Sequence, residues 1–277
     1  WPLVTRPPDV GGLGFNLKWN MGWMNDMCHY LKLDPWFRQF YHKDITFSLM
    51  YAFSENFVLP ISHDEVVHMK GSLRGKMPGD DWQQLAGVRA FTAYLLAHPG
   101  KKLTFMGAEL GQWHEWDFAS QLDWYLLENK ENQQTQRFFK DINRFYLSQS
   151  PLWDIDFSWE GFEWLADDNH NNVVVFVRRD RKGRELIAAV NFSPVGRADY
   201  RFGVPPKKIY REVFTTDLPA YGGTGDWRNE GELLTESIPS HGKPCSLCVT
   251  IPPLGAVFFA GEGEWQEEEK TNEPSEV

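Results

Sequence analysis

Residues Asn56 to His68 are the stretch that most constrains the fold of this chain. Their sequence, NFVLPISHDEVVH, starts as a short apolar run of strand type and ends in four ionisable side chains, those of His63, Asp64, Glu65 and His68. Charges beside a core are costly unless they are paired or held at an opening. A buried strand that ends in such residues is typical of an α/β enzyme, whose working side chains follow the carboxyl ends of its strands.

Helical and strand-like patterns alternate around this stretch. Periodicity predicts helices over residues 18–33, 44–54 and 133–148. It also predicts an amphipathic helix after Asp80. Asp80 is its N-cap, Gln83 takes the capping-box position and Gly100 ends it. Apolar runs predict short strands over residues 56–61 and 102–106. This alternation indicates a parallel α/β sheet with functional loops after its strands.

From about residue 152 the pattern changes to short strands separated by turns. Strand-like segments lie over residues 162–165, 173–177, 186–192, 200–202, 209–214, 246–251 and 257–259. They predict an antiparallel all-β domain of the sandwich type. We therefore expect an α/β domain over residues 1–157, an all-β domain over residues 158–261 and an acidic, disordered tail over residues 262–277.

Composition excludes several classes of protein. The net charge of −10 comes mostly from residues 262–277, which hold seven acidic residues and one lysine, and an acidic chain is not expected to bind nucleic-acid phosphates. No run of eighteen apolar residues is present, so no membrane span is expected. The 3 cysteines are too few for a disulfide framework, which fits a reducing cytoplasm.

Aromatic residues make up 15% of the chain, and 13 of them are tryptophans. The flat C–H faces of pyranose rings pack on indole, so proteins that handle sugars are rich in Trp, although Trp also builds ordinary cores. Carbohydrate binding is therefore one hypothesis for this chain.

The loop over residues 69–80 is rich in glycine and in basic residues. Such a composition suits phosphate, but the loop lacks the fixed P-loop spacing and its Lys-Ser or Lys-Thr ending. We interpret it as a mobile loop on the substrate side of the fold.

His63 and His68 lie close in sequence without a third convergent ligand, so we expect neither a metal nor another cofactor.

Motifs spread over the chain up to about residue 261 occur in a fixed order. They are LPISHDEVVH at 59–68, MPGDDW at 77–82, PGKKLTFMGAELGQ at 99–112, RRD at 178–180 and DYRFG at 199–203. This set resembles the bacterial 1,4-α-glucan (glycogen) branching enzymes of the α-amylase superfamily, glycoside hydrolase family thirteen. The resemblance implies the C-terminal half of a (β/α)8 TIM barrel over residues 1–157, followed by the β-sandwich domain over residues 158–261.

The resemblance also implies a retaining mechanism that uses three carboxylates. Asp64 matches the aspartate that stabilises the transition state by binding sugar hydroxyls, and His63 matches the neighbouring imidazole that contacts the sugar. Glu65, Trp113 and Trp116 are then expected to bind substrate, although each Trp also suits core packing. The nucleophilic Asp and the acid/base Glu of the family have no counterpart in this sequence. We therefore expect a fragment that is inactive by itself.

The activity implied is transfer of an α-1,4-glucan segment to a 6-hydroxyl, as in glycogen biosynthesis. Two other functions stay open at this stage. An α-glucan hydrolase shares the glycosyl-enzyme intermediate and differs in that water intercepts it. A non-catalytic carbohydrate-binding remnant would use exposed Trp side chains, with Asp64 vestigial. The expected partner is an α-1,4-glucan, without nucleic acid or membrane, for a cytoplasmic protein that is a monomer when full length.

Overall fold

Three short parallel strands form the sheet of the first half of the chain. The computed structural model describes residues 3–205 and 208–264. The strands pair in the order β1-β2-β3, and they are β1 (Lys18–Trp19), β2 (Phe57–Pro60) and β3 (Lys101–Leu103). Both predicted strands are confirmed, although β3 ends at Leu103. β1 was not expected, because two residues are too short for a periodic pattern.

Within the described residues, the helices are α1 (Met21–Lys32), α2 (Lys43–Thr46), α3 (Asp81–Ala97) and α4 (Lys130–Ser148). α1 begins later than predicted because Lys18 and Trp19 pair with β2, and the Asn20 side chain caps the helix by accepting the Trp23 N–H (3.0 Å). The segment 44–54 is not one helix, since a 3-10 turn follows α2 in a stretch of aromatic and β-branched residues. None of the described helices has the length and apolarity that crossing a membrane requires.

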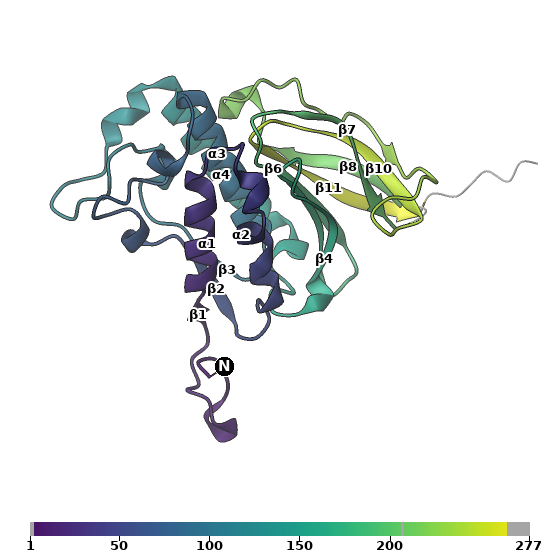
Figure 1. Ribbon diagram of the computed structural model, residues 1–277, viewed down its shortest axis with the longest axis horizontal. Coiled ribbons are helices and arrows are strands. Elements are labelled where there is room, and N and C mark those ends of the chain that lie inside the picture. The colour runs from purple at the N-terminus through teal and green to yellow at the C-terminus, as the bar shows by residue number, and fades with distance from the viewer. Residues whose placement is uncertain (1–2, 206–207, 265–277) are drawn as a thin grey trace, which may run out of the picture.

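α3 is the central helix of the molecule. Its predicted capping box is present, since the Asp80 carboxylate accepts the Gln83 N–H and the Gln83 amide oxygen accepts the Asp80 N–H. The prediction that it is amphipathic is wrong, because every residue over 85–97 is buried. On one side α3 packs against β6 and β11 of the antiparallel sheet, and on another Phe91 stacks on Trp23 of α1, so more than one layer covers it (Figure 1). It ends before Gly100, because His98 precedes a proline and is extended.

The second half is all β, as predicted. Its larger sheet has the order β4-β5-β6-β11-β8-β9, its smaller sheet pairs β7 with β10, and all pairs are antiparallel. Side chains that include Val175, Phe202 and Leu247 fill the space between the sheets, which makes a sandwich core. The strands are β4 (Phe162–Asp168), β5 (Val173–Arg179), β6 (Glu185–Asn191), β7 (Arg197–Val204), β8 (Lys208–Thr215), β9 (Leu233–Leu234), β10 (Cys245–Ile251) and β11 (Gly255–Glu264).

The acidic tail predicted over residues 262–277 begins inside β11, which runs to Glu264. Residues 265–277 lie outside the described residues.

The two halves share one hydrophobic core. Tyr94 of α3 packs edge-on against Phe176 of β5, with 6.2 Å between ring centroids, and against Phe192, at 5.7 Å. Phe145 of α4 stacks on Phe214 of β8 at 4.8 Å. Because rings from both helices pack on the larger antiparallel sheet, the position of the β domain relative to the parallel sheet is fixed (Figure 1).

A buried guanidinium joins the halves at their boundary. Arg178 of β5 is fully buried and donates to the carbonyls of Ala97 (2.7 Å), Gly161 (2.9 Å) and Ile155 (3.1 Å). The same guanidinium pairs with the Asp156 carboxylate at 2.9 Å. Because the Arg178–Asp156 pair is buried, removing the guanidinium would leave the negative charge of Asp156 in the core with one positive partner fewer.

We expect Arg178→Met to lower the free energy of unfolding by about 3–5 kcal/mol, the usual cost of breaking a buried ion pair. The matched control is Arg181→Met, which removes an arginine that is 73% exposed and paired with Asp154 at 2.6 Å. That change is expected to cost less than about 1 kcal/mol. Urea unfolding followed by circular dichroism measures both, and equal losses would contradict a special role for Arg178.

Glu55, just before β2, is buried and holds the N-terminal segment. Its carboxylate accepts the N–H groups of Leu3 (3.1 Å), Val4 (3.0 Å) and Thr5 (2.7 Å) and the Lys18 ammonium (3.3 Å). Burial raises the pKa of this carboxyl, but the hydrogen bonds from Thr5 and Val4 outweigh burial, and the pKa is lowered from 4.5 to about 2.

Because the pKa of Glu55 is lower in the folded state, its ionised form stabilises the fold above pH 4.5, and this contribution is lost as the pH falls toward about 2. We expect Glu55→Gln to lower the Tm at neutral pH and to flatten the fall in Tm over that acidic range. The exposed Glu160→Gln is the control. Thermal unfolding at a series of pH values tests this, and a Tm loss in Glu55→Gln that is the same at every pH would refute it.

Candidate functional site

The residues predicted to carry the chemistry lie at the carboxyl end of β2. β2 is buried along its length, and the chain then turns through the 3-10 turn His63–Glu65. Ser62 caps this turn, since its Oγ accepts the Asp64 N–H (3.3 Å) and its own N–H is bound by the Glu65 carboxylate (2.6 Å). This capping box sets the direction of each side chain in the turn.

His63 and Asp64 face outward. Their side chains are 51% and 59% exposed, and Nε2 of His63 lies 3.4 Å from Oδ1 of Asp64. The Lys70 ammonium donates to the Asp64 carbonyl (2.7 Å), which holds the backbone of the turn. The Asp64 carboxylate is therefore accessible to a ligand while its backbone is restrained.

Glu65 has a different environment. It is 4% exposed, and its carboxylate accepts both the N–H and the Oγ–H of Ser62, the latter at 2.7 Å. The Glu65 carbonyl accepts a hydrogen bond from Lys76. Glu65 thus closes the turn that orients Asp64, and its predicted contact with substrate stays a prediction.

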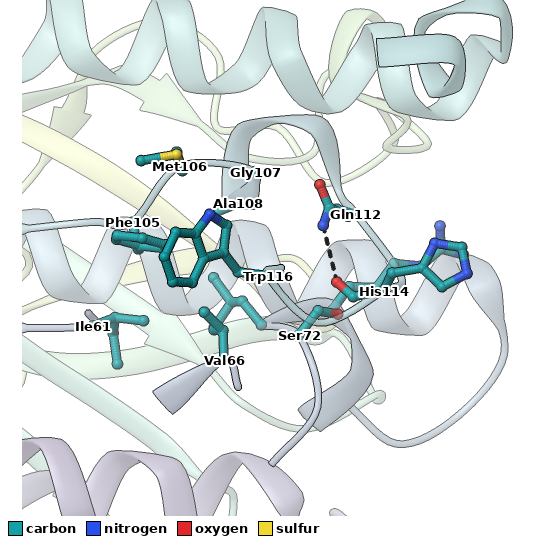
Figure 2. Close-up of a pocket in the computed structure, with 12 residues that line it drawn as sticks. Ile61, Val66, Ser72, Phe105, Met106, Gly107, Ala108, Gln112, His114 and Trp116 are labelled. Atoms are coloured by element: carbon teal, nitrogen blue, oxygen red, sulfur yellow. Dashed lines mark hydrogen bonds between the residues drawn. The ribbon is translucent and has the colours of Figure 1, made fainter. Parts of the chain in front are cut away.

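Two aromatic rings support the His63 imidazole. The ring centroid of His63 lies 6.1 Å from that of Phe105 and 6.2 Å from that of Trp116, and those two rings contact edge to face at 5.1 Å. Phe105 follows β3, and Trp116 is held by a hydrogen bond from its N–H to the Val66 carbonyl (2.9 Å). Figure 2 shows Phe105 and Trp116 side by side. The imidazole therefore rests on an apolar surface built by the neighbouring strand and loop.

A cavity adjoins these rings (Figure 2). Its wall combines the apolar Ile61 and Val66 with the polar Gln112 and His114. Gln112 donates to the His114 carbonyl (3.1 Å), and the His114 ring pairs with Asp123 (2.8 Å). The lining of this cavity includes Trp116 but neither His63 nor Asp64, so the exposed turn, rather than the cavity, is the candidate site.

The two tryptophans predicted to bind substrate have different neighbours. Trp116 contacts His63, whereas Trp113 covers the Arg74 guanidinium, which lies 4.3 Å from the indole centroid. Arg74 also pairs with Asp81 at 2.7 Å. The structure therefore brings together His63, Asp64 and Trp116, and it gives the partly exposed Trp113 a role in packing the loop over residues 69–80.

Lys76 anchors that loop from inside, a role that no sequence pattern indicated. The residue is 4% exposed, and its ammonium donates to the carbonyls of Glu65, Lys70 (2.8 Å) and Gly71 (2.8 Å). Burial lowers the pKa of this ammonium. The loop that we interpreted as mobile therefore has a buried cation at its centre, bound to the backbone of the candidate site.

Glu115 is the second anchor that the sequence did not indicate. Its carboxylate accepts the N–H groups of Met69 (2.9 Å) and Gly71 (2.6 Å), which lower the pKa of this carboxyl. His68 and Met69 both have positive φ, 55° and 67°, a conformation that is costly for residues with a side chain. The carboxylate thus stabilises a strained turn. Glu115 and Met69 are 46 residues apart in the sequence, so local sequence patterns do not reveal this hydrogen bond.

This arrangement suits the binding of a sugar. A carboxylate accepts hydrogen bonds from hydroxyls, an imidazole both donates and accepts them, and an aromatic face packs against C–H groups. Among the residues that the structure describes, no group of three or more His, Cys, Asp or Glu side chains could hold a metal ion.

Comparison with known proteins agrees with this chemistry. The 1,4-alpha-glucan branching enzyme GlgB of Aquifex aeolicus (strain VF5) is 52% identical over 265 residues, which are 95% of this chain and 42% of that enzyme. The enzyme of the same name from Rubrobacter xylanophilus is 52% identical over 261 residues, 94% of this chain and 36% of that enzyme. The chain is homologous to the bacterial 1,4-alpha-glucan branching enzymes. This confirms the resemblance seen in the motifs, over about two fifths of the length of these relatives.

The β domain and the fold have matches of their own. Residues 164–262 match the alpha amylase C-terminal all-beta domain family. The crystal structure of an alpha-amylase from H. orenii superposes with a TM-score of 0.52 at 16% identity, and the match covers 92% of this branching-enzyme homologue and 50% of the amylase. At that identity the likeness concerns the fold.

We expect Glu115→Ala to release the turn over residues 68–71, because the amides of Met69 and Gly71 lose their acceptor. Hydrogen exchange at these two amides should accelerate about tenfold or more, since exchange follows the free energy of local opening. Asp117→Ala, which removes an exposed carboxylate bonded to the Ala119 amide of its own turn, is the control. Unchanged exchange in Glu115→Ala would show that Lys76 holds the loop without it.

Proposed function

We propose that this chain is part of a 1,4-α-glucan branching enzyme, a glycosyltransferase that cleaves an α-1,4-glucan and transfers the segment to a 6-hydroxyl with retention of configuration. The observation that carries the proposal is the 52% identity to the Aquifex aeolicus branching enzyme over 95% of this chain. The exposed Asp64 carboxylate at the carboxyl end of β2 supports it, because loops at that end of parallel strands hold the active sites of barrel enzymes.

In the proposed mechanism, Asp64 accepts hydrogen bonds from two hydroxyls of the sugar at the cleavage site. These bonds strengthen as the sugar flattens toward an oxocarbenium ion, so they stabilise the transition state more than the ground state. His63 contacts the same sugar, and Trp116 supports His63 and borders the subsite. Trp113 and Glu65 complete the predicted contacts with substrate.

Retaining transfer also needs a nucleophilic carboxylate and an acid/base carboxylate. Because this chain spans 42% of the length of the Aquifex relative, we propose that both groups lie in the remaining part of the enzyme. The parallel sheet would then be the second half of a (β/α)8 barrel. Exposed apolar side chains in and just before β1, those of Phe15 (62%), Leu17 (43%) and Trp19 (43%), support this, since further barrel elements would cover them.

We further propose a division into a barrel part over residues 1–157 and a β domain over residues 158–261. The start of β4 at Phe162 supports this boundary. The substrate is an α-1,4-glucan, and the full-length enzyme is a cytoplasmic monomer.

We expect Asp64→Asn to lower kcat/KM of the protein made from its complete natural gene by about a thousandfold, since the amide loses the charge that stabilises the transition state. Circular dichroism should be unchanged, because the side chain is exposed. Asp117→Asn is the control and should keep full activity. Turnover of amylose is followed by the iodine spectrum, and reducing ends are counted in parallel.

The two readouts separate the possible reactions. A shift of the iodine spectrum without new reducing ends supports branching, whereas accumulating reducing ends would make the enzyme an α-glucan hydrolase. Glucan binding without turnover would favour a non-catalytic protein. Full activity in Asp64→Asn would refute the assignment of this residue.

A further inference from the structure

A groove of about 650 Å³ lies between the α/β part and the β domain. Its wall comes from loops of both halves: residues 34–39 after α1, residues 77–83 before and in α3, residues 170–172 between β4 and β5, and residues 193–197 between β6 and β7. This lining is separate from that of the cavity in Figure 2. The proposed chemistry at Asp64 does not use it.

The side chains of the groove are those that bind neutral sugars. Trp36 lines it and is 72% exposed, so its indole is free to pack on the C–H face of a pyranose ring. Planar polar groups surround it. The side chains of Gln39, Gln83, His170, Asn171 and Asn172 can both donate and accept hydrogen bonds, and the Arg197 guanidinium donates them. Such groups match the adjacent hydroxyls of a sugar.

Three polar atoms in the wall lack a hydrogen-bond partner within the described residues. They are Nε of Arg38, Oδ1 of Asn172 and Nε of Arg197, and all three atoms are shielded from solvent. Arg38 and Asn172 are 2% and 6% exposed as residues. A buried polar atom without a partner costs about 1–3 kcal/mol. These atoms lie beneath the surface of the groove, so they add to the polar character of its wall and are not themselves the contacts proposed for a ligand.

The other polar atoms of Arg38 and Asn172 are already bonded, which keeps the wall in place. Arg38 donates to the carbonyls of Phe192 (2.7 Å) and Leu31 (3.0 Å), so it ties α1 to the β domain. Asn172 donates to the Pro35 carbonyl at 3.1 Å. The wall of the groove is therefore held in place by bonds between the two halves of the chain.

We propose that this groove binds a segment of a neutral α-1,4-glucan chain, as a second glucan site apart from the turn at Asp64. That the sugar is an α-1,4-glucan rests on the proposed function. That the groove binds a sugar at all is inferred from its exposed Trp36 and its polar lining residues. A glucan held here is anchored to the same loop that supports the candidate site, since Met77, Pro78 and Gly79 line the groove.

The test measures binding of maltoheptaose to the protein by calorimetry, and locates it by hydrogen exchange at residues 34–39 and 170–172. We expect Trp36→Ala to raise the dissociation constant at this site about tenfold, the effect of losing one stacking contact. Trp36→Phe should restore part of the affinity. Trp36 is exposed, so its truncation leaves the fold intact.

The control is Trp159→Ala, which removes an indole that is 55% exposed and belongs to another segment. Unchanged binding in Trp36→Ala, or no protection of the two segments by maltoheptaose, would overturn the proposal. Equal binding of cellohexaose would overturn its selectivity for α-glucans. Asp64→Asn should keep binding at the groove. If the protein made from the complete natural gene binds maltoheptaose through Trp36 but does not branch amylose, the proposed function is refuted and this inference stands.

Discussion

The guanidinium of Arg178 is the interaction on which the arrangement of the two halves depends. A buried cation is tolerated only where its N–H groups find acceptors and its charge finds a partner. Here the acceptors are the carbonyl at the end of α3 and two carbonyls of the segment before β4, and the partner is Asp156. Movement of any of these segments would leave charge uncompensated in the core. One side chain of the β domain therefore fixes the end of the central helix.

The same contacts reach the candidate site through β3. Asp156 also accepts a hydrogen bond from Lys101, the first residue of β3, at 2.8 Å. Phe105, just beyond the other end of that strand, packs against His63 and Trp116. A series of contacts thus links the imidazole to a carboxylate at the domain boundary and to an arginine of the β domain. Although no residue of the β domain touches His63 in this chain of contacts, the domain supports the geometry around it.

Sequence patterns predicted the parts of the fold that depend on neighbours along the chain. The buried strand before Asp64, the capping box at Asp80 and the alternating strands of the second half are local features, and the structure has them. The sequence did not indicate the burial of Lys76 or the bonds of Glu115, because their partners are backbone groups of a loop that only the folded chain brings near. The amphipathic pattern expected for α3 failed for a related reason, since two layers cover it.

The resemblance gave Asp64 and Glu65 different roles, and the 3-10 turn gives them different environments. In a strand, consecutive side chains alternate between two faces, so one carboxylate of such a pair is expected inside and one outside. Here the strand has ended, and the capping box draws the Glu65 carboxylate back onto Ser62 while Asp64 stays open. The buried carboxylate accepts the N–H and the hydroxyl of Ser62 through one of its oxygens. The Asp64 carboxylate stays exposed, so two adjacent acids in one motif have different environments, one bonded within the turn and one open to solvent.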